Sequence, residues 1–417
     1  MTNNKDKKVL NVPNLRFPEF TEEWKKVRVS NLLDFYPTNS LSWEQLDYSN
    51  GQIKNLHYGL IHKGLPTMVD ASSDLLPYIK EEIVPKSYTL FKEGDVSFAD
   101  ASEDANDVAK AIEILNCNGQ QIVSGLHTIH GRDNTDQTVI GYKGYAFASE
   151  SFHKQIRRIA QGTKVFSVSV RNFDETYIGV PSKDEQAKIA KLLIAIDKRI
   201  ATQNKIIEKY ESLIQAIIYQ KKMDGIREGN WQKTELSKVL QERTEKNING
   251  YTVCSVSVSQ GVINQIEYLG RSFAAKETSH YNIVKYGDIV YTKSPTGDFP
   301  YGIVKRCYIK NAVAVSPLYG VYKPINDNIG VFLHFYFMQS NNAFNYLHPL
   351  IQKGAKNTIN ITNARFLENS IPLPKTEDEV VYIANALTSI QTRIDVEKSL
   401  LCSYEKEKQY LLRQMFI

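Results

Sequence analysis

The sequence predicts an α+β protein in which two mixed α/β units are separated by two long helices, paired as an antiparallel coiled coil with pseudo-two-fold symmetry. Three observations predict this fold. The length of 417 residues exceeds what one hydrophobic core usually organises. The same sequence features recur in both halves, and a heptad pattern follows each half. A content of 42% hydrophobic and 23% charged residues is typical of globular proteins and excludes a largely disordered chain.

The repeat is visible in short phrases that recur in the same order. Trp24 and Trp231 each begin an amphipathic stretch. The pairs Gly94-Asp95 and Gly287-Asp288 each precede an alternating segment, which is typical of a turn that leads into a β-strand. A phrase that contains proline then leads into each long helix, so the chain order is unit, helix, unit, helix.

Each half ends in a segment whose apolar residues alternate steps of three and four, the a/d pattern of a coiled coil. The first helix delivers the chain to the second unit, so a second helix that packs along it most simply returns. We therefore expect an antiparallel pair. The predicted packing positions are Ile189, Leu193, Ile196, Ile200, Ile207 and Tyr210 in the first helix, and Ile383, Leu387, Ile390, Ile394, Leu401 and Tyr404 in the second.

These features divide the chain into four segments. Residues 1–180 form the first unit, 181–223 a central spacer helix, 224–374 the second unit, and 375–417 a C-terminal spacer helix. Within the units we predict one helix over 331–345. Apolar alternation predicts strands over 95–99, 165–170, 251–258, 288–292, 301–304 and 318–322.

Composition excludes several protein classes. The N-terminus lacks the apolar region of a signal peptide, and no apolar run is long enough to span a membrane, so we expect a cytoplasmic protein. The four cysteines are far apart and predict neither a disulfide framework nor a zinc site, so we interpret them as buried thiols. The net charge of +5 permits a polyanionic partner without requiring one.

Catalytic motifs are missing from the sequence. No two glycines lie two residues apart and no glycine precedes a lysine, so dinucleotide, S-adenosylmethionine and Walker A loops of the glycine-rich type are excluded. Glu19, Glu23 and Lys25 only loosely match the acidic residues and lysine of a nuclease site. A solvent-exposed segment that leads to Trp24 is the better interpretation of these residues. His127 and His130 point to opposite strand faces, which disfavours a metal site; for His130, hydrogen-bonded packing remains an equal alternative to a polar contact.

Seven phrases of the sequence are distinctive. They are PTNSLS (37–42), NLHYGLIH (55–62), DASED (100–104) and SGLHT (124–128) in the first half, GDIVY (287–291) and VSPLY (315–319) in the second, and the helix phrase EQAKIA (185–190). Together they resemble the specificity (S) subunit of type I restriction-modification enzymes, the HsdS family. The resemblance implies a DNA-binding subunit without catalysis, which acts in defence against foreign DNA. It also implies two modification subunits that methylate adenine N6 with S-adenosylmethionine, and two restriction subunits that use ATP and Mg²⁺ to translocate and cleave DNA.

By the same resemblance, each unit reads one half of a bipartite DNA target. The spacer helices set the number of unread base pairs and dock the modification subunits. Because the two units differ in sequence, the target should be asymmetric.

Candidate DNA contacts follow from residue type, since short polar side chains, Arg and Lys read bases while Lys, Arg and main-chain N–H groups hold phosphates. Asn and Ser also form plain turns, and the acidic neighbours of Ser102 also form salt bridges, so structural roles remain open. The candidates are Thr38, Asn39, Ser40, Ser42, Ser102, His127, Thr128, Arg132, Lys164 and Arg171 in the first unit, and Thr292, Lys293, Ser294, Lys353, Lys356 and Asn357 in the second.

Charge is distributed unevenly between the units. Residues 1–181 contain 20 basic and 23 acidic side chains, whereas residues 223–374 contain 16 and 11. The first unit must therefore concentrate its positive charge locally or rely on partner subunits. The alternative interpretation is a non-catalytic coiled-coil scaffold whose two domains bind proteins. It explains the helices equally well, but it does not explain polar loops in matching positions of both units.

Overall fold

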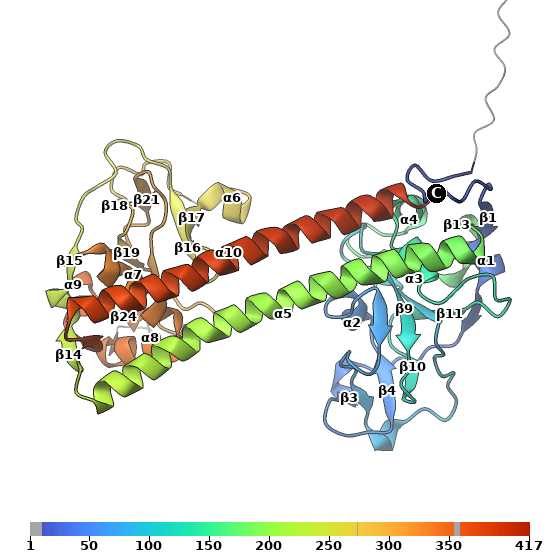
Figure 1. The fold of residues 1–417 in the computed structure, drawn as a ribbon, viewed down its shortest axis with the longest axis horizontal. Coiled ribbons are helices and arrows are strands. Elements are labelled where there is room, and N and C mark those ends of the chain that lie inside the picture. Colours follow the sequence, from blue (N-terminus) through green and yellow to red (C-terminus); the bar gives the residue numbers. More distant parts are fainter. Residues whose placement is uncertain (1–10, 273, 354–358) are drawn as a thin grey trace, which may run out of the picture. The chain divides into compact units, whose positions relative to one another are not determined.

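The computed structural model describes residues 11–272, 274–353 and 359–417, and its contacts divide the chain into two units (Figure 1). Unit 1 comprises the chain up to Asn204 together with Leu400–Ile417, and unit 2 comprises Lys205–Ser399. Each unit contains one α/β region and part of both long helices. The division of the sequence at 180, 223 and 374 stays a prediction. No helix in the described ranges is long and apolar enough to cross a membrane.

Unit 1 is built on two mixed sheets. Its strands are β1 (Lys25–Arg28), β2 (Asp34–Tyr36), β3 (Leu46–Asp47), β4 (Ile53–Leu56), β5 (Met68–Asp70), β6 (Tyr78–Ile79), β7 (Val96–Ala99), β8 (Ala101–Ser102), β9 (Ala111–Asn116), β10 (Gln121–Ser124), β11 (Thr128–Arg132), β12 (Phe166–Ser167) and β13 (Tyr177–Val180). The larger sheet has the order β2-β11-β7-β9-β5, in which only β5 and β9 are parallel. The smaller sheet has the order β10-β4-β6-β3, with β10 and β4 parallel. The pairs β1-β13 and β8-β12 are antiparallel.

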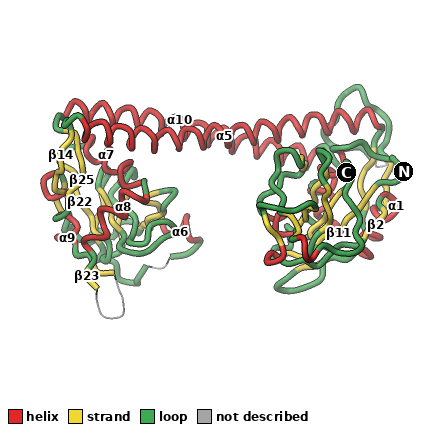
Figure 2. Tube along the Cα trace, turned by 90° about the horizontal axis from the view of Figure 1, so that it is seen from below, coloured by secondary structure: helices red, strands yellow, loops and turns green. Residues whose placement is uncertain are grey.

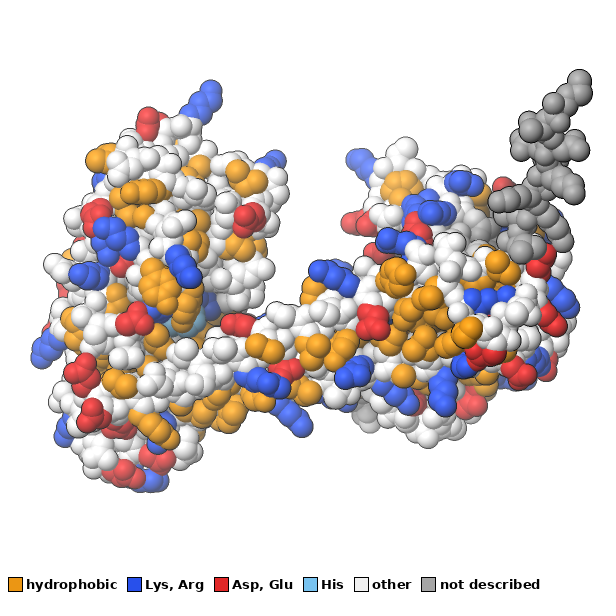
Figure 3. Space-filling view, turned by 45° about the horizontal axis from the view of Figure 1, so that its top comes forward, with side chains coloured by type: hydrophobic (Ala, Val, Ile, Leu, Met, Phe, Trp, Pro, Cys, Tyr) orange, Lys and Arg blue, Asp and Glu red, His pale blue; other side chains and the backbone are white. Residues whose placement is uncertain are grey.

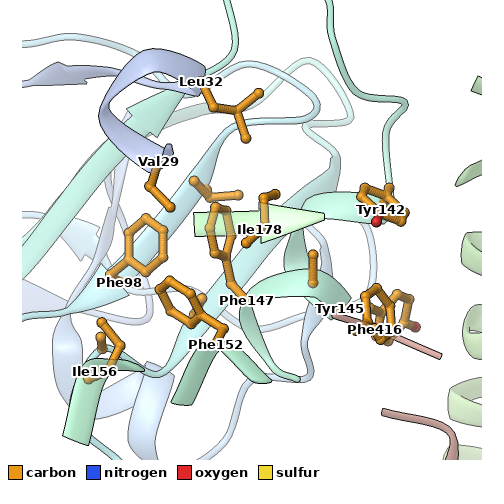
Figure 4. Close-up of a cluster of buried hydrophobic side chains, with 14 of the residues drawn as sticks. Val29, Leu32, Phe98, Tyr142, Tyr145, Phe147, Phe152, Ile156, Ile178 and Phe416 are labelled. Atoms are coloured by element: carbon orange, nitrogen blue, oxygen red, sulfur yellow. The ribbon is translucent and has the colours of Figure 1, made fainter. Parts of the chain in front are cut away.

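Short helices enclose the core of unit 1. They are α1 (Val29–Leu32), α2 (Tyr58–His62), α3 (Tyr142–Phe147) and α4 (Glu150–Ile159), with 3-10 turns η1 (Trp43–Gln45), η2 (Glu81–Ile83) and η3 (Val170–Glu175). Helix α4 places Phe152 and Ile156 one turn apart on its buried face. Figure 4 shows Phe98, Phe147 and Phe152 gathered in this core, where the ring centroids of Phe98 and Phe147 are 4.8 Å apart.

The end of the chain belongs to the same core. Phe416 is 6% exposed, and its ring centroid lies 6.5 Å from that of Trp24. The ring centroid of Tyr142 lies 5.8 Å from that of Phe416, and both residues are labelled in Figure 4. The Leu15 N–H donates to the Gln414 carbonyl at 2.9 Å. Unit 1 is therefore closed by residues from both ends of the sequence.

Unit 2 is built on smaller antiparallel sheets. Its strands are β14 (Trp231–Glu235), β15 (Leu240–Glu242), β16 (Cys254–Ser257), β17 (Gly261–Asn264), β18 (Asn282–Val284), β19 (Ile289–Tyr291), β20 (Val304–Arg306), β21 (Val313–Val315), β22 (Gly320–Pro324), β23 (Gln352–Lys353), β24 (Ile359–Asn360) and β25 (Ser370–Pro374). Its short helices are α6 (Gln265–Leu269), α7 (Asp327–Met338), α8 (Ser340–Leu347) and α9 (Asn363–Leu367), with 3-10 turns η4 (Leu236–Lys238) and η5 (His348–Leu350). The central sheet has the order β15-β22-β19-β20, and α7 packs on it beside β20.

The long helices are α5 (Lys183–Arg227) and α10 (Glu377–Gln414), and their segments lie side by side in each unit (Figure 2). In unit 1 Lys408 Nζ lies 2.7 Å from Asp197 Oδ1, and in unit 2 Lys398 Nζ donates to Glu211 Oε1 at 2.8 Å. Residue numbers rise along α5 while those of the partners fall along α10, so the pairing is antiparallel. All predicted packing positions, from Ile189 to Tyr210 and from Ile383 to Tyr404, are buried or half-buried.

The recurring tryptophans have the same role in both units. Trp24 Nε1 donates to Glu185 Oε2 at 3.2 Å, and Trp231 Nε1 donates to Glu379 Oε1 at 2.8 Å. Both glutamates lie in the first turn of the helix that follows the unit, where the helix dipole favours a carboxylate. Each unit is thus joined to its following helix by a buried indole.

The recurring Gly-Asp turns also correspond in structure. Asp95, 1% exposed, accepts from Arg132 Nε at 2.8 Å and from the Lys92 N–H at 2.8 Å. Asp288, also 1% exposed, accepts from Arg243 Nε at 2.6 Å and from the N–H three residues earlier at 2.7 Å. In both units the carboxylate closes the turn and pairs with an arginine.

Four details differ from the expectations. The segment 165–170 forms only the short strand β12, because Ser169 and Asn172 form a capping box that starts η3. The strand predicted at 301–304 begins at Val304. The helix predicted over 331–345 is two helices, which meet at Gln339 in extended conformation. Cys254 and Cys307 are buried as expected, but Cys402 is exposed on α10 and Cys117 is only half-buried.

Candidate nucleic-acid interface

The polar loop before η1 is fixed by Asn39. The Asn39 N–H donates to the Ser124 carbonyl at 3.1 Å, its Nδ2 donates to the same oxygen at 2.6 Å, and its Oδ1 accepts from Asn55 Nδ2 at 3.0 Å. Asn39 thus ties the loop to β10 and β4 and uses its amide inside the unit. Thr38 and Ser40 on either side of it are exposed, so they are the loop residues that a ligand can reach.

His127 stands in the turn between β10 and β11. Its backbone φ is +54°. Few residues other than glycine adopt this left-handed conformation, and it is often found at functional sites. The His127 side chain is 50% exposed, and its Nδ1 lies 3.1 Å from Asp100 Oδ1. Burial raises the pKa of Asp100, and the His127 partner offsets part of that rise. Asp100 was not among the sequence candidates; its only signal was its place in the phrase 100–104.

Hydrogen bonds bring the other predicted loops of unit 1 to the same region. The Asp100 N–H donates to the His127 carbonyl at 3.0 Å, and the Asp100 carbonyl accepts from Val168 N at 2.9 Å. Strand β8, with the half-buried Ser102, pairs with β12, and the exposed Lys164 lies in the turn just before β12. The exposed Arg171 follows in η3. The structure therefore gathers the loops at 38–42, 100–104, 124–128 and 160–168.

Besides Asn39, three candidates of unit 1 have structural roles. Thr128 is 3% exposed and donates through Oγ1 to the Gly125 carbonyl at 2.6 Å. Arg132 donates to both oxygens of Asp95, at 2.8 and 2.7 Å. The Ser42 N–H donates to Gln45 Oε1 at 2.9 Å, and Ser42 caps the start of η1. These side chains are used within the unit, and we leave them out of the proposed interface.

An aromatic cluster lies beside the gathered loops. The ring centroids of Trp43 and His57 are 4.2 Å apart, those of His57 and Tyr58 4.7 Å, and those of Tyr58 and His127 5.2 Å. His57 is 1% exposed, and its Nδ1 accepts from the Gly59 N–H at 3.1 Å. Burial, and to a smaller extent the charge of His127, lower the pKa of His57 to about 4, so its ring is neutral at neutral pH.

The candidates of unit 2 lie after β19. Thr292 is 3% exposed, and its Oγ1 accepts from the Ile303 N–H at 3.1 Å, which is a structural role. Lys293 has φ +59°, and its Nζ donates to Asn363 Oδ1 at 2.5 Å; burial lowers the pKa of Lys293. Ser294 is exposed. The Lys293–Asn363 bond brings this loop to the start of α9, directly after the hairpin β23-β24.

The predicted clamp of unit 2 is described only in part. Lys353 ends β23, which pairs with β24. Lys356 and Asn357 lie outside the described residues. Among the residues that are described, no group of three or more His, Cys, Asp or Glu side chains is arranged to hold a metal ion.

A family model decides what this arrangement is. Residues 21–212, which include the gathered loops of unit 1, match the model described as type I restriction modification DNA specificity domain. This part of the chain belongs to that family. The resemblance to a type I specificity subunit is therefore confirmed, and so is a role in DNA sequence specificity. A DNA specificity domain selects a sequence and does not catalyse a reaction, so the chain is not an enzyme by itself.

One solved structure of similar fold supports the predicted architecture. The S subunit of a type I restriction-modification system from M. genitalium is 13% identical, with 97% of this chain and 99% of that chain covered and a TM-score of 0.57. The HsdS subunit from Thermoanaerobacter tengcongensis is 15% identical, with 93% and 95% covered and a TM-score of 0.38. The first likeness confirms the predicted fold of two mixed units with long helices.

Proposed function

We propose that this specificity subunit reads a bipartite, asymmetric DNA target, with one half-site for each α/β unit. The two units share a frame: a tryptophan bonded to the following helix and a buried Gly-Asp turn paired with arginine. The loops that this frame carries differ in length and sequence. The observation that supports the proposal best is that both units have the same frame, while the loops carried by the frame differ between the two units.

Within unit 1, the proposed DNA contacts are the predicted residues that are exposed on the gathered loops. Thr38, Ser40 and His127 are candidates for base contacts, because short polar side chains and histidine can pair with base edges. Lys164 and Arg171 are candidates for phosphate contacts, because each places an exposed positive charge on the gathered loops. In unit 2 we keep Lys293, Ser294 and Lys353 as candidates, together with Lys356 and Asn357 from the sequence.

The outer faces of the long helices suit the docking of modification subunits. On the unit 2 part of α5, Tyr219, Met223 and Ile226 are 55%, 46% and 53% exposed and follow one another at helical spacing. On the unit 1 part of α5, an apolar hollow of about 460 Å³ is lined by Ile140, Ile194 and neighbouring residues. Figure 3 shows hydrophobic side chains at the surface of the helical segments. Exposed apolar stripes of this kind mark sites of protein interaction.

The proposed complex contains DNA, two modification subunits and two restriction subunits, and we place it in the cytoplasm. S-adenosylmethionine, ATP and Mg²⁺ belong to the partner subunits in this proposal. The alternative, a coiled-coil scaffold whose domains bind proteins, does not account for the match of residues 21–212 to a DNA specificity domain.

An exchange of recognition loops tests the proposal. Residues 34–175, which lie between the anchors Trp24 and Glu185, are replaced by the equivalent region of another specificity subunit, and methylated adenines are mapped in a host with the partner subunits. We expect one half of the target to change and the other to stay. A change in both halves, or in neither, would contradict separate reading by the units.

Two smaller changes test the roles of a clamp and a spacer. Lys164→Ala should weaken binding to all sequences alike and reduce the salt dependence by about one ion, because it removes one phosphate contact. If only sequence preference is lost, Lys164 contacts a base instead.

An insertion of four residues near Gln203 should lengthen the unread spacer or abolish activity, and an unchanged target would contradict the spacer role of α5.

A further inference from the structure

Trp43 differs from the other two tryptophans of the chain. Trp24 and Trp231 are 3% and 5% exposed and anchor the units to the long helices, whereas Trp43 is 45% exposed. It lies in η1, directly after the polar loop that Asn39 fixes. Tryptophan is highly buried on average in proteins and is enriched at interfaces, because burial removes a large apolar area from water.

The ring of Trp43 is backed on one side. The His57 ring lies 4.2 Å from it, centroid to centroid, with an interplanar angle of 34°. The backbone at Gly59 also lies close to the indole, since a Cβ added there would be 3.0 Å from a Trp43 ring carbon. His57 is held by its bond from the Gly59 N–H. His57 is thus held in position against Trp43, and 45% of the Trp43 surface remains exposed to solvent.

The exposed surface of Trp43 lies among the groups proposed to read DNA. Tyr58 contacts both His57, which backs Trp43, and His127, which stands on the neighbouring turn. The polar residues Thr38 and Ser40 precede Trp43 on the same loop. A single apolar plane is thus set among polar side chains that can pair with base edges.

We propose that Trp43 contacts the 5-methyl group of a thymine in the half-site that unit 1 reads. This inference rests on the proposed function. In the major groove the thymine methyl is the apolar group on the base edges, and it is read by apolar contact. More than half of the Trp43 surface is packed against its own unit, so the ring does not protrude as a wedge between base pairs would have to. Contact with an edge therefore fits the geometry better than intercalation.

The test couples one protein change to one DNA change in the complex with the modification subunits. The probes are duplexes of the mapped target, in which each thymine of the unit 1 half-site is replaced in turn by uracil. At one position the wild type should bind the uracil duplex about four-fold more weakly, the effect of one lost methyl contact. Trp43→Ala should bind both duplexes equally, and Trp43→Phe should retain part of the discrimination. Uracil in the other half-site is the matched control and should give the same result in all three proteins.

Fluorescence of the chain without partner subunits, titrated with an excess of target DNA, gives a second readout, because the other two tryptophans of this chain are buried. Target DNA should change the tryptophan emission of the wild type and not that of Trp43→Phe. Unchanged affinity and discrimination in Trp43→Ala would overturn the inference and leave the proposed function intact. A different outcome is that Trp43→Ala binds the thymine and uracil duplexes with equally reduced affinity, while the wild type increases the fluorescence of 2-aminopurine placed in the half-site. That result would overturn the methyl contact and show that Trp43 stacks on a base. Failure of the wild-type complex to bind the mapped target in preference to random DNA would instead refute the proposed function.

Discussion

The buried Gly-Asp turns should hold their own unit together, and a single change can test this. Asp95 is 1% exposed and accepts from Arg132 Nε at 2.8 Å, from Arg132 Nη2 at 2.7 Å and from His130 Nε2 at 2.8 Å. Asp95→Asn keeps the size of the side chain and removes the charge that Arg132 needs. Breaking one partner of a buried ion pair costs about 3–5 kcal/mol, because the remaining charge stays buried without compensation. We expect Asp95→Asn to lower the free energy of unfolding of unit 1 by about 3 kcal/mol, since the amide oxygen still accepts one bond.

The pH dependence has a defined sign. Burial by itself raises the pKa of Asp95, but the hydrogen bonds from Arg132 and His130 outweigh burial and leave that pKa lower than the ordinary value of 3.8. The folded state therefore binds this proton less readily than the unfolded state does. The stabilisation is complete above pH ~4 and is lost as the pH falls through the lower folded pKa. Asp95→Asn should abolish this part of the acid dependence.

Hydrogen exchange measured by mass spectrometry can assign the loss to one unit. Peptides from β7 and β11 should exchange faster in Asp95→Asn, and those from β19 and β22 should not; Asp288→Asn should give the reverse pattern. Asp136→Asn is the matched control, because its pair with Lys183 is exposed and should contribute nothing measurable. A loss below about 1 kcal/mol, or faster exchange in both units, would refute the reasoning.

Three further changes have distinct expected outcomes. Phe416→Ala should destabilise unit 1 by about 3–5 kcal/mol, because it leaves a cavity between Trp24 and Tyr142. Hydrogen exchange of β1 peptides that is slower or unchanged in this variant would contradict the prediction. Gly225→Ala would usually stabilise a helix, but its Cβ would lie 2.0 Å from the Trp231 ring, so a lower melting temperature is expected in a thermal scan. Burial lowers the pKa of His334 to about 3, so the folded state binds this proton less readily than the unfolded state does. The stability of unit 2 should therefore fall as the pH drops below about 6.5, and urea titrations of His334→Gln should lack this pH dependence.

The repeat and the helices could be predicted because their signals are periodic and local. Heptad spacing alone placed Ile189 and Ile383 on buried faces of the long helices. The recurring tryptophans and the acidic first turns of the helices were also recognisable. Their link was not, because the Trp24–Glu185 hydrogen bond joins residues that lie 161 positions apart in the sequence.

The candidate site was only partly predictable, because residue type does not reveal which polar groups are already paired. Arg132 and Thr128 suit DNA by type, yet strand alternation places them where Asp95 and Gly125 are their partners. Asn39 is similar, since it fixes a loop instead of presenting its amide. The side chains left exposed, such as His127, are distinguished by backbone conformation and by distant partners, and neither property follows from local sequence.

Charge leads to a last prediction, about the chain without its partners. Each phosphate contact needs a positive side chain, and affinity for DNA falls steeply with salt in proportion to the number of such contacts. Residues 1–181 carry three more acidic than basic side chains, 23 against 20, and Arg132, Lys143 and Arg16 are used in pairs with Asp95, Glu113 and Glu185. Each of these pairs also uses one acidic side chain, so the net charge of residues 1–181 stays at −3 (20 − 23) and leaves no excess of positive charge for phosphates. The isolated chain should therefore bind its mapped target weakly, and addition of modification subunits should raise both the affinity and the slope of its salt dependence in a fluorescence anisotropy titration. Tight binding by the isolated chain that salt hardly weakens would show that the specificity subunit supplies the non-electrostatic affinity itself.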